Sequence, residues 1–321
     1  MPQRLEQISS RSWEHPADRA ALNSLRALPG FDEVVRKIAS FFGERGVRQL
    51  FLADAVLVGP NQRPKLYAAW SEVLTTLDWP ERPELYVTQT PFANAGAVGF
   101  ERPFVIINSG TLALLDETEL KAVLGHELGH IMSGHTTYTT IALILINFGL
   151  NNLPFLASIA ILPFQLALLE WYRKSELSCD RAGLLAIQDL QAAMSGEMKL
   201  AGGTTTTDTM SVDEFIKQAE AYETGGNAWD TVLKLLNTAF RTHPFHTVRA
   251  SELLRWHRGG GYDAILAGNY IRRGREDEQP LTKDYEDAAG YYGEQVRETF
   301  APVGDALNRA FSKFNEAWRN R

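Results

Sequence analysis

Residues 126 to 130 read His-Glu-Leu-Gly-His, a spacing that can hold a metal ion. On a helix of 3.6 residues per turn, His126 and His130 lie on one face about one turn apart, so both imidazoles can bind one ion. Glu127 projects roughly 100° around the helix and can reach beside the metal. Zn²⁺ binds imidazole nitrogen and carboxylate oxygen in a tetrahedral site, and a catalytic site keeps one position for water. The spacing therefore predicts a zinc hydrolase that needs a third protein ligand elsewhere.

The surrounding residues predict the helix that this spacing requires. Asp116 and Glu119 form a capping-box pattern just before it. An apolar stripe follows at helical intervals: Leu120, Val123, Leu124, Leu128 and Ile131. The alternative is an amphipathic helix whose histidines only pack or form hydrogen bonds, because a five-residue match can arise by chance.

A second charged cluster, at residues 171–183, can supply the missing ligand. Glu176 and Asp180 are four residues apart in a stretch of helical periodicity, so they share a face. Glu176 is the predicted third zinc ligand. Asp180 is suited to hold the second nitrogen of a ligand imidazole, which sets its tautomer and orientation. The alternative is a solvated charged face.

A metzincin site would need a histidine at position 136, where this chain has Thr136. His135 comes one residue too early for that pattern. We therefore expect His135 to be a surface or partly buried histidine at the helix end, where a positive charge suits the helix dipole.

Several separated segments resemble the gluzincin metallopeptidases, a family that includes the CAAX prenyl proteases, the HtpX heat-shock proteases and the Oma-type stress proteases. The resemblance covers about residues 80–256. It is carried by Asn94–Ala97 with the run 103–110, by residues 114–130 and 173–183, and by Thr242-His243-Pro244 with Arg249. It implies zinc on His126, His130 and Glu176, with Glu127 as the general base.

Two residues depart from the family pattern. Cys179 stands where a small residue such as alanine is usual, and we expect it to be a buried small hydrophobic residue under the helix. Phe245 replaces a common second proline but leaves the His243-Pro244 turn intact.

The predicted reaction is hydrolysis of a peptide bond. Zinc lowers the pKa of its bound water and polarises the carbonyl, while Glu127 removes the proton and later protonates the leaving amine. The oxyanion needs a further donor, for which His243 is the catalytic candidate. The alternative is that His243 only occupies a proline turn. Further oxyanion or structural candidates are Arg173, His246 and Arg249.

Residues 92–99 are mostly small and precede a β-patterned run that ends at Ile107, which predicts an edge strand. In gluzincins such a strand pairs with extended substrate through main-chain hydrogen bonds. The resemblance therefore implies that a polypeptide binds in extended form at Asn94, Ala95, Gly96 and Ala97. The alternative is a glycine-containing loop.

Residues 136–169 contain no charged side chain, so this stretch could meet a membrane. A spanning helix needs about 20 apolar residues. Polar residues and a proline divide the run into shorter pieces, and its ends must return to one zinc site, so only a hairpin is allowed. A membrane hairpin like that of HtpX-type relatives, a buried helical hairpin, a lid over the cleft and a dimer interface all stay open.

The composition predicts a globular protein, since 45% of the 321 residues are hydrophobic and 22% are charged. A net charge of −7 without a basic stripe argues against nucleic acid as a partner. The single Cys179 excludes an intrachain disulfide, and the polar start of the chain lacks the apolar core of a signal peptide. We expect a cytoplasmic location. The alternative is a membrane-associated protein with its active site on the cytoplasmic side.

The expected fold is mainly α with a small β-sheet (α+β), built around a zincin-like catalytic domain. We expect an N-terminal helical region at residues 1–80, a metallopeptidase core at 81–258 and a C-terminal helical extension at 259–321. Within that extension, residues 285–318 have the pattern of an amphipathic helix that docks on the body or a partner. Helices are also expected at 212–222 and 229–240.

A function from another class is a zinc-containing binding or chaperone-like protein whose cleft is plugged. The intact Glu127 weighs against it, because a structural site needs no base. A latent enzyme occluded by the 136–169 hairpin or the C-terminal helix is a third hypothesis.

Overall fold

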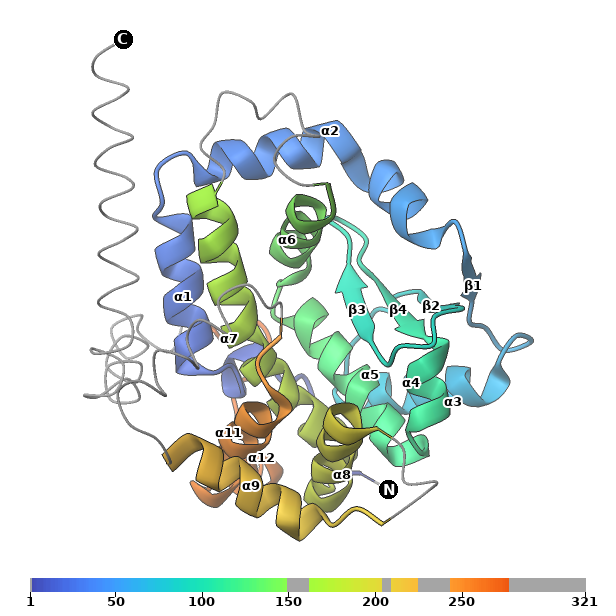
Figure 1. Cartoon of the computed structure of the whole chain (residues 1–321), viewed down its shortest axis with the longest axis vertical. Helices are drawn as coiled ribbons and strands as arrows, with labels where there is room; N and C mark the ends of the chain where they lie inside the picture. The colour runs from blue at the N-terminus through green and yellow to red at the C-terminus, as the bar shows by residue number, and fades with distance from the viewer. Residues whose placement is uncertain (1, 149–161, 204–208, 225–242, 277–321) are drawn as a thin grey trace.

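The computed structural model describes residues 2–148, 162–203, 209–224 and 243–276, in which helices surround one small sheet (Figure 1). This is the mainly α, α+β fold that the sequence predicts. The helices are α1 (Pro16–Arg26), α2 (Phe31–Leu52), α3 (Pro64–Thr76), α4 (Ser109–Leu114), α5 (Glu117–Met132), α6 (Thr136–Phe148), α7 (Leu162–Ile187), α8 (Leu190–Gly202), α9 (Val212–Thr224), α11 (His246–Arg258) and α12 (Gly261–Leu266), preceded by a 3-10 helix, η1 (Ser10–Ser12).

The sheet has the strand order β1-β2-β4-β3. Its strands are β1 (Ala55–Leu57), β2 (Leu85–Thr88), β3 (Ala95–Val98) and β4 (Phe104–Asn108). β2 and β4 are parallel, whereas β1 pairs with β2 and β3 with β4 in antiparallel fashion. The predicted β-region therefore forms, and β3 lies at an edge of the described sheet, beside α5 (Figure 1).

The start of α5 is set by the predicted capping box. The Asp116 side chain accepts hydrogen bonds from the backbone N–H groups of Thr118 and Glu119. The Glu119 side chain accepts one from the backbone N–H of Asp116 at 2.9 Å. Because this cap fixes where the helix begins, it also fixes which residues of α5 face inward.

Helices α5 and α7 pack so closely that glycine is required where they meet. A Cβ atom at Gly125 on α5 would lie 2.4 Å from the Cβ of Ala186 on α7. A Cβ atom at Gly183 on α7 would lie 2.7 Å from the carbonyl oxygen of Ala122 on α5. Both distances are shorter than real carbon contacts, so no larger residue fits without separating the helices.

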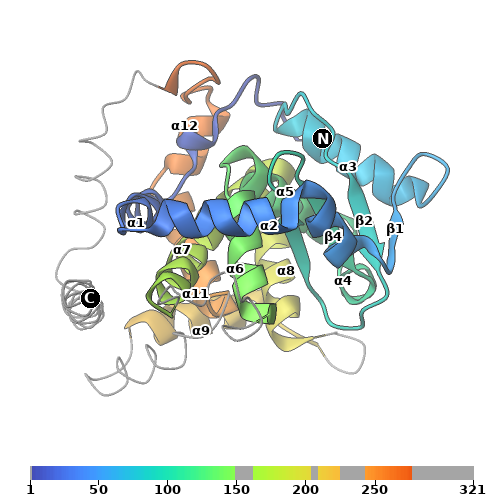
Figure 2. The same ribbon diagram turned by 90° about the horizontal axis from the view of Figure 1, so that it is seen from above.

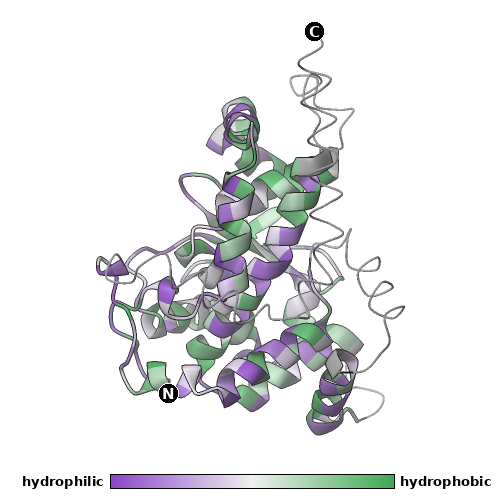
Figure 3. Ribbon diagram, turned by 90° about the vertical axis from the view of Figure 1, so that its left-hand side faces the viewer, coloured by the Kyte–Doolittle hydropathy of each residue, from purple (hydrophilic) through white to green (hydrophobic). Residues whose placement is uncertain are grey.

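Two hydrophobic clusters fill the interior. One joins the sheet to α3, α5, α7, α8, α9, α11 and α12. The other joins α1, α2, α6 and the first half of α7. Hydrophobic and hydrophilic residues alternate along the helices in Figure 3, as expected when each helix has one buried and one exposed face. Helix α7 therefore belongs to both clusters, whereas the buried apolar residues of α5 belong to the first.

The described residues of the 136–169 stretch are mostly buried or half-buried, although Ile146 of α6 is 37% exposed. Ile141 and Leu145 of α6 and Leu168 of α7 are fully buried in the second cluster. Helix α2 lies across α6 (Figures 1 and 2). Residues 149–161, at the tip of the expected hairpin, lie outside the described residues. Among the helices that the structure describes, none combines the length and apolar character needed to span a membrane.

The two ends of the described chain pair with each other. The backbone N–H of Ser9 donates to the carbonyl of Ile271 at 2.9 Å, and that of Arg273 donates to the carbonyl of Gln7 at 2.7 Å. Tyr262 and Ile265 of α12 are buried in the first cluster. Residues 259–276 thus pack on the body, and the expected domain boundaries stay predictions. Expected helix 212–222 corresponds to α9, whereas 229–240 and 285–318 lie outside the described residues.

We predict that Gly183→Ala lowers the free energy of unfolding by about 1–3 kcal/mol, because the new methyl group meets a backbone oxygen of α5. The matched control is Gly196→Ala on α8, where a Cβ atom would lie 3.8 Å from the Cβ of Glu119, an ordinary contact. The control should be neutral or stabilising by up to about 1 kcal/mol. Urea unfolding of both variants measures this, and equal stabilities would contradict the close packing.

Candidate active site

Two helices bring the three side chains that the sequence predicts as metal ligands to one point. His126 and His130 come from α5, and Glu176 comes from α7. The Nε2 atoms of the two histidines are 3.2 Å apart. The Glu176 carboxylate oxygens lie 3.5 Å from Nε2 of His126 and 3.2 Å from Nε2 of His130. Two imidazoles and a carboxylate, far apart in sequence, therefore converge inside the protein as the spacing predicts.

These distances fit a tetrahedral metal ion. Ligand atoms about 2.0–2.1 Å from a zinc ion, at the tetrahedral angle, lie about 3.3–3.4 Å from one another. The two Nε2 atoms are 3.2 Å apart, Oε1 of Glu176 lies 3.2 Å from Nε2 of His130, and Oε2 of Glu176 lies 3.5 Å from Nε2 of His126, all close to that value. Two imidazole nitrogens that face each other at this distance also suit a cation between them. The residues present can therefore hold such an ion.

Cys179 is a competing third ligand, since its sulfur lies within 4.8 Å of the ligand nitrogens of His126 and His130. Burial raises the pKa of its thiol well above the usual value, and nearby carboxylates add to this. A metal requires the thiolate. The Glu176 oxygens lie 3.5 and 3.2 Å from the two Nε2 atoms that face each other. Burial raises the pKa of Glu176, but the charges of His243 and His126 outweigh it and hold this pKa well below the usual value. Sγ of Cys179 instead lies 3.7 Å from Nδ1 of His135, the nitrogen that faces Nδ1 of His130, and Cys179 packs against Gly129. The geometry therefore favours Glu176 as the third ligand.

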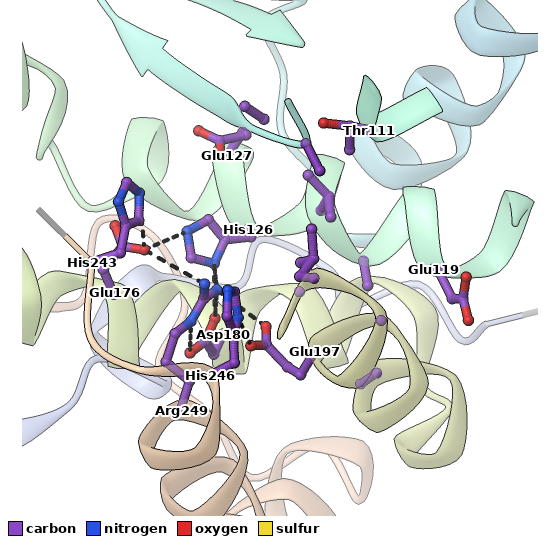
Figure 4. Close-up of a pocket in the computed structure, with 18 of the residues that line it drawn as sticks. Thr111, Glu119, His126, Glu127, Glu176, Asp180, Glu197, His243, His246 and Arg249 are labelled. Atoms are coloured by element: carbon purple, nitrogen blue, oxygen red, sulfur yellow. Dashed lines mark hydrogen bonds and ion pairs between the residues drawn. The ribbon is translucent and has the colours of Figure 1, made fainter. Parts of the chain in front are cut away.

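Asp180 holds the orientation of His126 (Figure 4). Its carboxylate accepts a hydrogen bond from Nδ1 of His126 at 3.0 Å, which leaves Nε2 directed at the metal point. Arg249 of α11 donates to both oxygens of Asp180, from Nε at 2.9 Å and from Nη2. Burial raises the pKa of Asp180, but the charge and hydrogen bonds of Arg249 lower it to about 2.

The two ligand histidines differ in their electrostatic surroundings. Burial lowers the pKa of His130 to about 4, which favours the neutral form that binds metals. Burial also lowers the pKa of His126, but the charge of Glu176 and the hydrogen bond to Asp180 outweigh it and raise the value to about 10. A cation bound at the site would replace the proton that Nε2 of His126 otherwise carries.

Glu127 lies beside the ligands on α5 rather than among them (Figure 4). Burial raises the pKa of its carboxyl group to about 7, while the charge of His126 and a hydrogen bond from the backbone of Ala97 act against this. Its pKa is therefore near neutrality, where a carboxylate can both accept and return a proton. Ala97 belongs to β3, so the edge strand touches the expected base.

A cavity of about 240 Å³ opens onto these groups. Asn94, just before β3, and Ala95, its first residue, line the cavity. Gly96 and Ala97, the next residues of the strand, are not among the lining residues. Its other lining residues include His126, Glu127, Glu176, Asp180, Glu197, His243, His246 and Arg249. The cavity thus joins the edge strand to the metal-binding side chains.

Of the remaining expected site residues, His243, His246 and Arg249 line the cavity, whereas Arg173 does not. Nε2 of His243 lies 3.6 Å from a Glu176 oxygen, at the cavity wall, and Nδ1 of His246 lies 2.8 Å from Glu197. Arg249 is tied to Asp180, which favours its structural reading over an oxyanion role. Among the described residues, Arg173 forms an ion pair with Glu170 on its own helix and does not line the cavity.

Sequence reasoning missed two residues next to the site. Glu197 of α8 lies 3.2 Å from Nη2 of Arg249, a contact that depends on how α8 packs on α11 and leaves no motif. His135 was expected at the surface or partly buried at a helix end, and that expectation is wrong. It is fully enclosed between the end of α5 at Met132 and the start of α6, and its ring packs on Trp171 and His130.

Comparison with known proteins points to one family. The model of peptidase family M48 matches residues 60–257. The plastoglobule-localized metallopeptidase 48, chloroplastic, of Arabidopsis thaliana is 33% identical over 271 residues, which cover 83% of this chain and 78% of that protein. No solved structure matches the chain.

Bacterial proteins named protease HtpX homolog match over shorter stretches. The one from Moorella thermoacetica is 32% identical over 114 residues, which cover 35% of this chain and 37% of that protein. The one from Helicobacter pylori strain J99 is 26% identical over 196 residues, which cover 53% of this chain and 63% of that protein. The chain therefore spans only part of the length of these relatives.

We predict that Arg249→Lys weakens divalent-metal affinity by about 10–100-fold, because a lysine cannot span both oxygens of Asp180 and His126 then loses its fixed orientation. The affinity is measured by competition with a chromogenic chelator. The matched control is Arg258→Lys on the same helix, whose side chain is 63% exposed and pairs with Glu220. Equal affinities in the two variants would show that this arginine does not support the metal site.

Proposed function

The chain belongs to peptidase family M48, and from that premise we propose that it is a zinc-dependent endopeptidase. The observation that supports this best is the meeting of His126, His130 and Glu176 within 3.2–3.5 Å, with Glu127 beside them in an open cavity. Imidazole and carboxylate ligands in a tetrahedral arrangement suit zinc. Glu127 is not needed to hold an ion, so its position favours catalysis over a structural metal site.

In the proposed mechanism, the bound ion supplies a Lewis acid that lowers the pKa of a water molecule and polarises the peptide carbonyl. Glu127 takes the proton of that water and returns it to the leaving amine. Its pKa of about 7, raised by burial, suits both transfers near neutral pH. Asp180 and Arg249 keep His126 oriented while charge develops beside it.

His243 is the proposed donor to the oxyanion. Its Nε2 atom borders the point where the ligands meet, 3.6 Å from Glu176. Burial lowers the pKa of His243, although the charge of Glu176 acts against this. A neutral imidazole can still donate one hydrogen bond to the negative oxygen that forms during attack.

We propose that the substrate is a polypeptide bound in extended form along β3. This strand pairs with β4 on one side and borders the cavity near its first residues. Thr111 anchors the approach to the strand, because its hydroxyl accepts from the backbone N–H of Asn94 and donates to its carbonyl, each at 2.7 Å. Main-chain pairing gives affinity with little sequence preference, which suits cleavage of unfolded chains in protein quality control.

Location and assembly stay proposals. We propose a cytoplasmic protein, in keeping with its single, buried Cys179. The Arabidopsis relative is named as plastoglobule-localized and chloroplastic. Membrane association or self-association through residues 136–169 is the alternative, and so is latency through that segment.

We predict that Glu127→Gln retains the metal but loses about 10²–10⁴-fold in hydrolysis of casein and unfolded peptides, because the amide cannot accept the proton. The control is Glu117→Gln on the same helix, a side chain 74% exposed that should leave activity unchanged. Metal analysis accompanies both assays. One zinc per chain with cleavage lost only in the Glu127 variant is the expected result. Zinc bound without cleavage by the wild type would favour the plugged binding protein.

We predict that His243→Ala lowers kcat by about 10²–10³-fold with little change in KM and with the metal retained, because the oxyanion loses its donor. Steady-state kinetics on a peptide substrate, together with zinc analysis, measures this. A kcat close to that of the wild type would leave His243 only a role in the His-Pro turn.

A further inference from the structure

A second hydrogen-bonded chain leads away from the metal-binding side chains. Nδ1 of His130 lies 3.3 Å from Nδ1 of His135. Nε2 of His135 lies 3.1 Å from a carboxylate oxygen of Asp18 on α1. The three residues are 3%, 2% and 1% exposed, so water does not compete for these contacts. Asp18 lies outside residues 60–257, the part of the chain that the family model matches.

Asp18 is held firmly at the end of this chain. Nε1 of Trp171 donates to one of its oxygens at 3.0 Å. The hydroxyl of Ser178 donates to the other oxygen at 2.6 Å. Both donors belong to α7, the helix that also carries Glu176. A buried carboxylate with this many donors is a fixed acceptor, and it ties α1 to the helix that contributes the third ligand.

The direction of each hydrogen bond follows from the acceptor at the end. A carboxylate only accepts, so Nε2 of His135 carries the proton that faces Asp18. In a neutral imidazole the other nitrogen is then the acceptor, so Nδ1 of His135 accepts from Nδ1 of His130. That leaves Nε2 of His130 with a free lone pair, which points at Glu176 and His126.

We propose that Asp18 and His135 are positioning residues that select the metal-binding tautomer of His130 and hold its ring in place. This inference rests on the proposed function, because it concerns the same metal site. Asp180 fixes the tautomer and orientation of His126 through a direct hydrogen bond. For His130, the carboxylate of Asp18 acts through the ring of His135, which lies between them. The ring of His135 is itself packed edge-on against Trp171, with centroids 5.4 Å apart, so it cannot turn freely. Helix α1 therefore contributes to the proposed metal site through Asp18.

The competing reading is a buried polar network that contributes only to folding. Trp70→Phe separates the two readings, because it removes a buried hydrogen bond, from Nε1 of Trp70 to the carbonyl of Pro83 at 3.0 Å, that involves none of these three residues. His135→Phe keeps a ring but removes both nitrogens. His135→Asn keeps one short polar side chain that can accept from Nδ1 of His130. Asp18→Asn keeps the shape but removes the charge.

The experiment is zinc titration of the full-length, metal-stripped protein against a chromogenic chelator, with urea unfolding of each metal-free variant. We expect His135→Phe to weaken zinc binding by about 10–100-fold, His135→Asn to recover much of that loss, and Trp70→Phe to lose stability while its zinc affinity stays within about threefold of the wild type. Zinc affinities of the His135 and Asp18 variants equal to that of Trp70→Phe would overturn the inference.

A readout on the wild type remains informative if a variant does not fold. Long-range ¹H–¹⁵N correlation spectra of the zinc-bound protein report which ring nitrogen carries the proton. We expect Nδ1–H on His130 and Nε2–H on His135, and any other pair of tautomers contradicts the proposal. Zinc binding with the expected tautomers but no proteolysis would contradict the proposed endopeptidase function and leave the role of Asp18 and His135 supported. A wild type that binds no zinc would overturn both.

Discussion

Helices α5 and α7 approach each other with glycine at their contact, and every part of the metal site depends on that distance. The absence of a Cβ atom at Gly125 and Gly183 lets the two helices approach this closely. Only then can a carboxylate from α7 come within 3.2–3.5 Å of two imidazoles from α5. The capping box at Asp116 adds the second requirement, because it sets the rotation of α5 about its axis. The distance between α5 and α7 and the rotation of α5 about its axis together determine where the three side chains meet.

Burying so many ionisable groups is unfavourable unless each has a partner, and the structure supplies partners from four helices. Arg249 of α11 neutralises Asp180 and approaches Glu197 of α8. Asp18 of α1 accepts hydrogen bonds from α7 and faces His135. The two hydrophobic clusters hold these helices against α5 and α7, so the polar network and the packing support each other. Glu127 differs, since burial raises the pKa of its carboxyl group to about 7, which suits the proton transfer that we propose for it.

The cavity receives its shape from elements that surround the two metal-site helices. Strand β3 forms one border, and its Ala97 contacts Glu127 through the backbone. Helix α8 and the start of α11 form the opposite border with Glu197, His243 and His246. An extended chain lying along β3 would therefore pass directly over the ligands and the base.

The sequence by itself determined the parts that depend on local spacing. The His-Glu-Leu-Gly-His pattern, the capping box before it and the Glu176–Asp180 pair each follow from one helix turn, and the β-region and mainly α fold follow from local periodicity. Only the tertiary structure decided that His135 is fully buried, that Arg173 is not among the residues that line the cavity, and that Glu197 and Asp18 lie beside the site. The physical reason is that these contacts join residues from 44 to 160 positions apart along the chain, such as Cys179 with His135 and Ser178 with Asp18. Periodicity reports which way a side chain points from its own helix, whereas the partner that it meets depends on how whole helices pack.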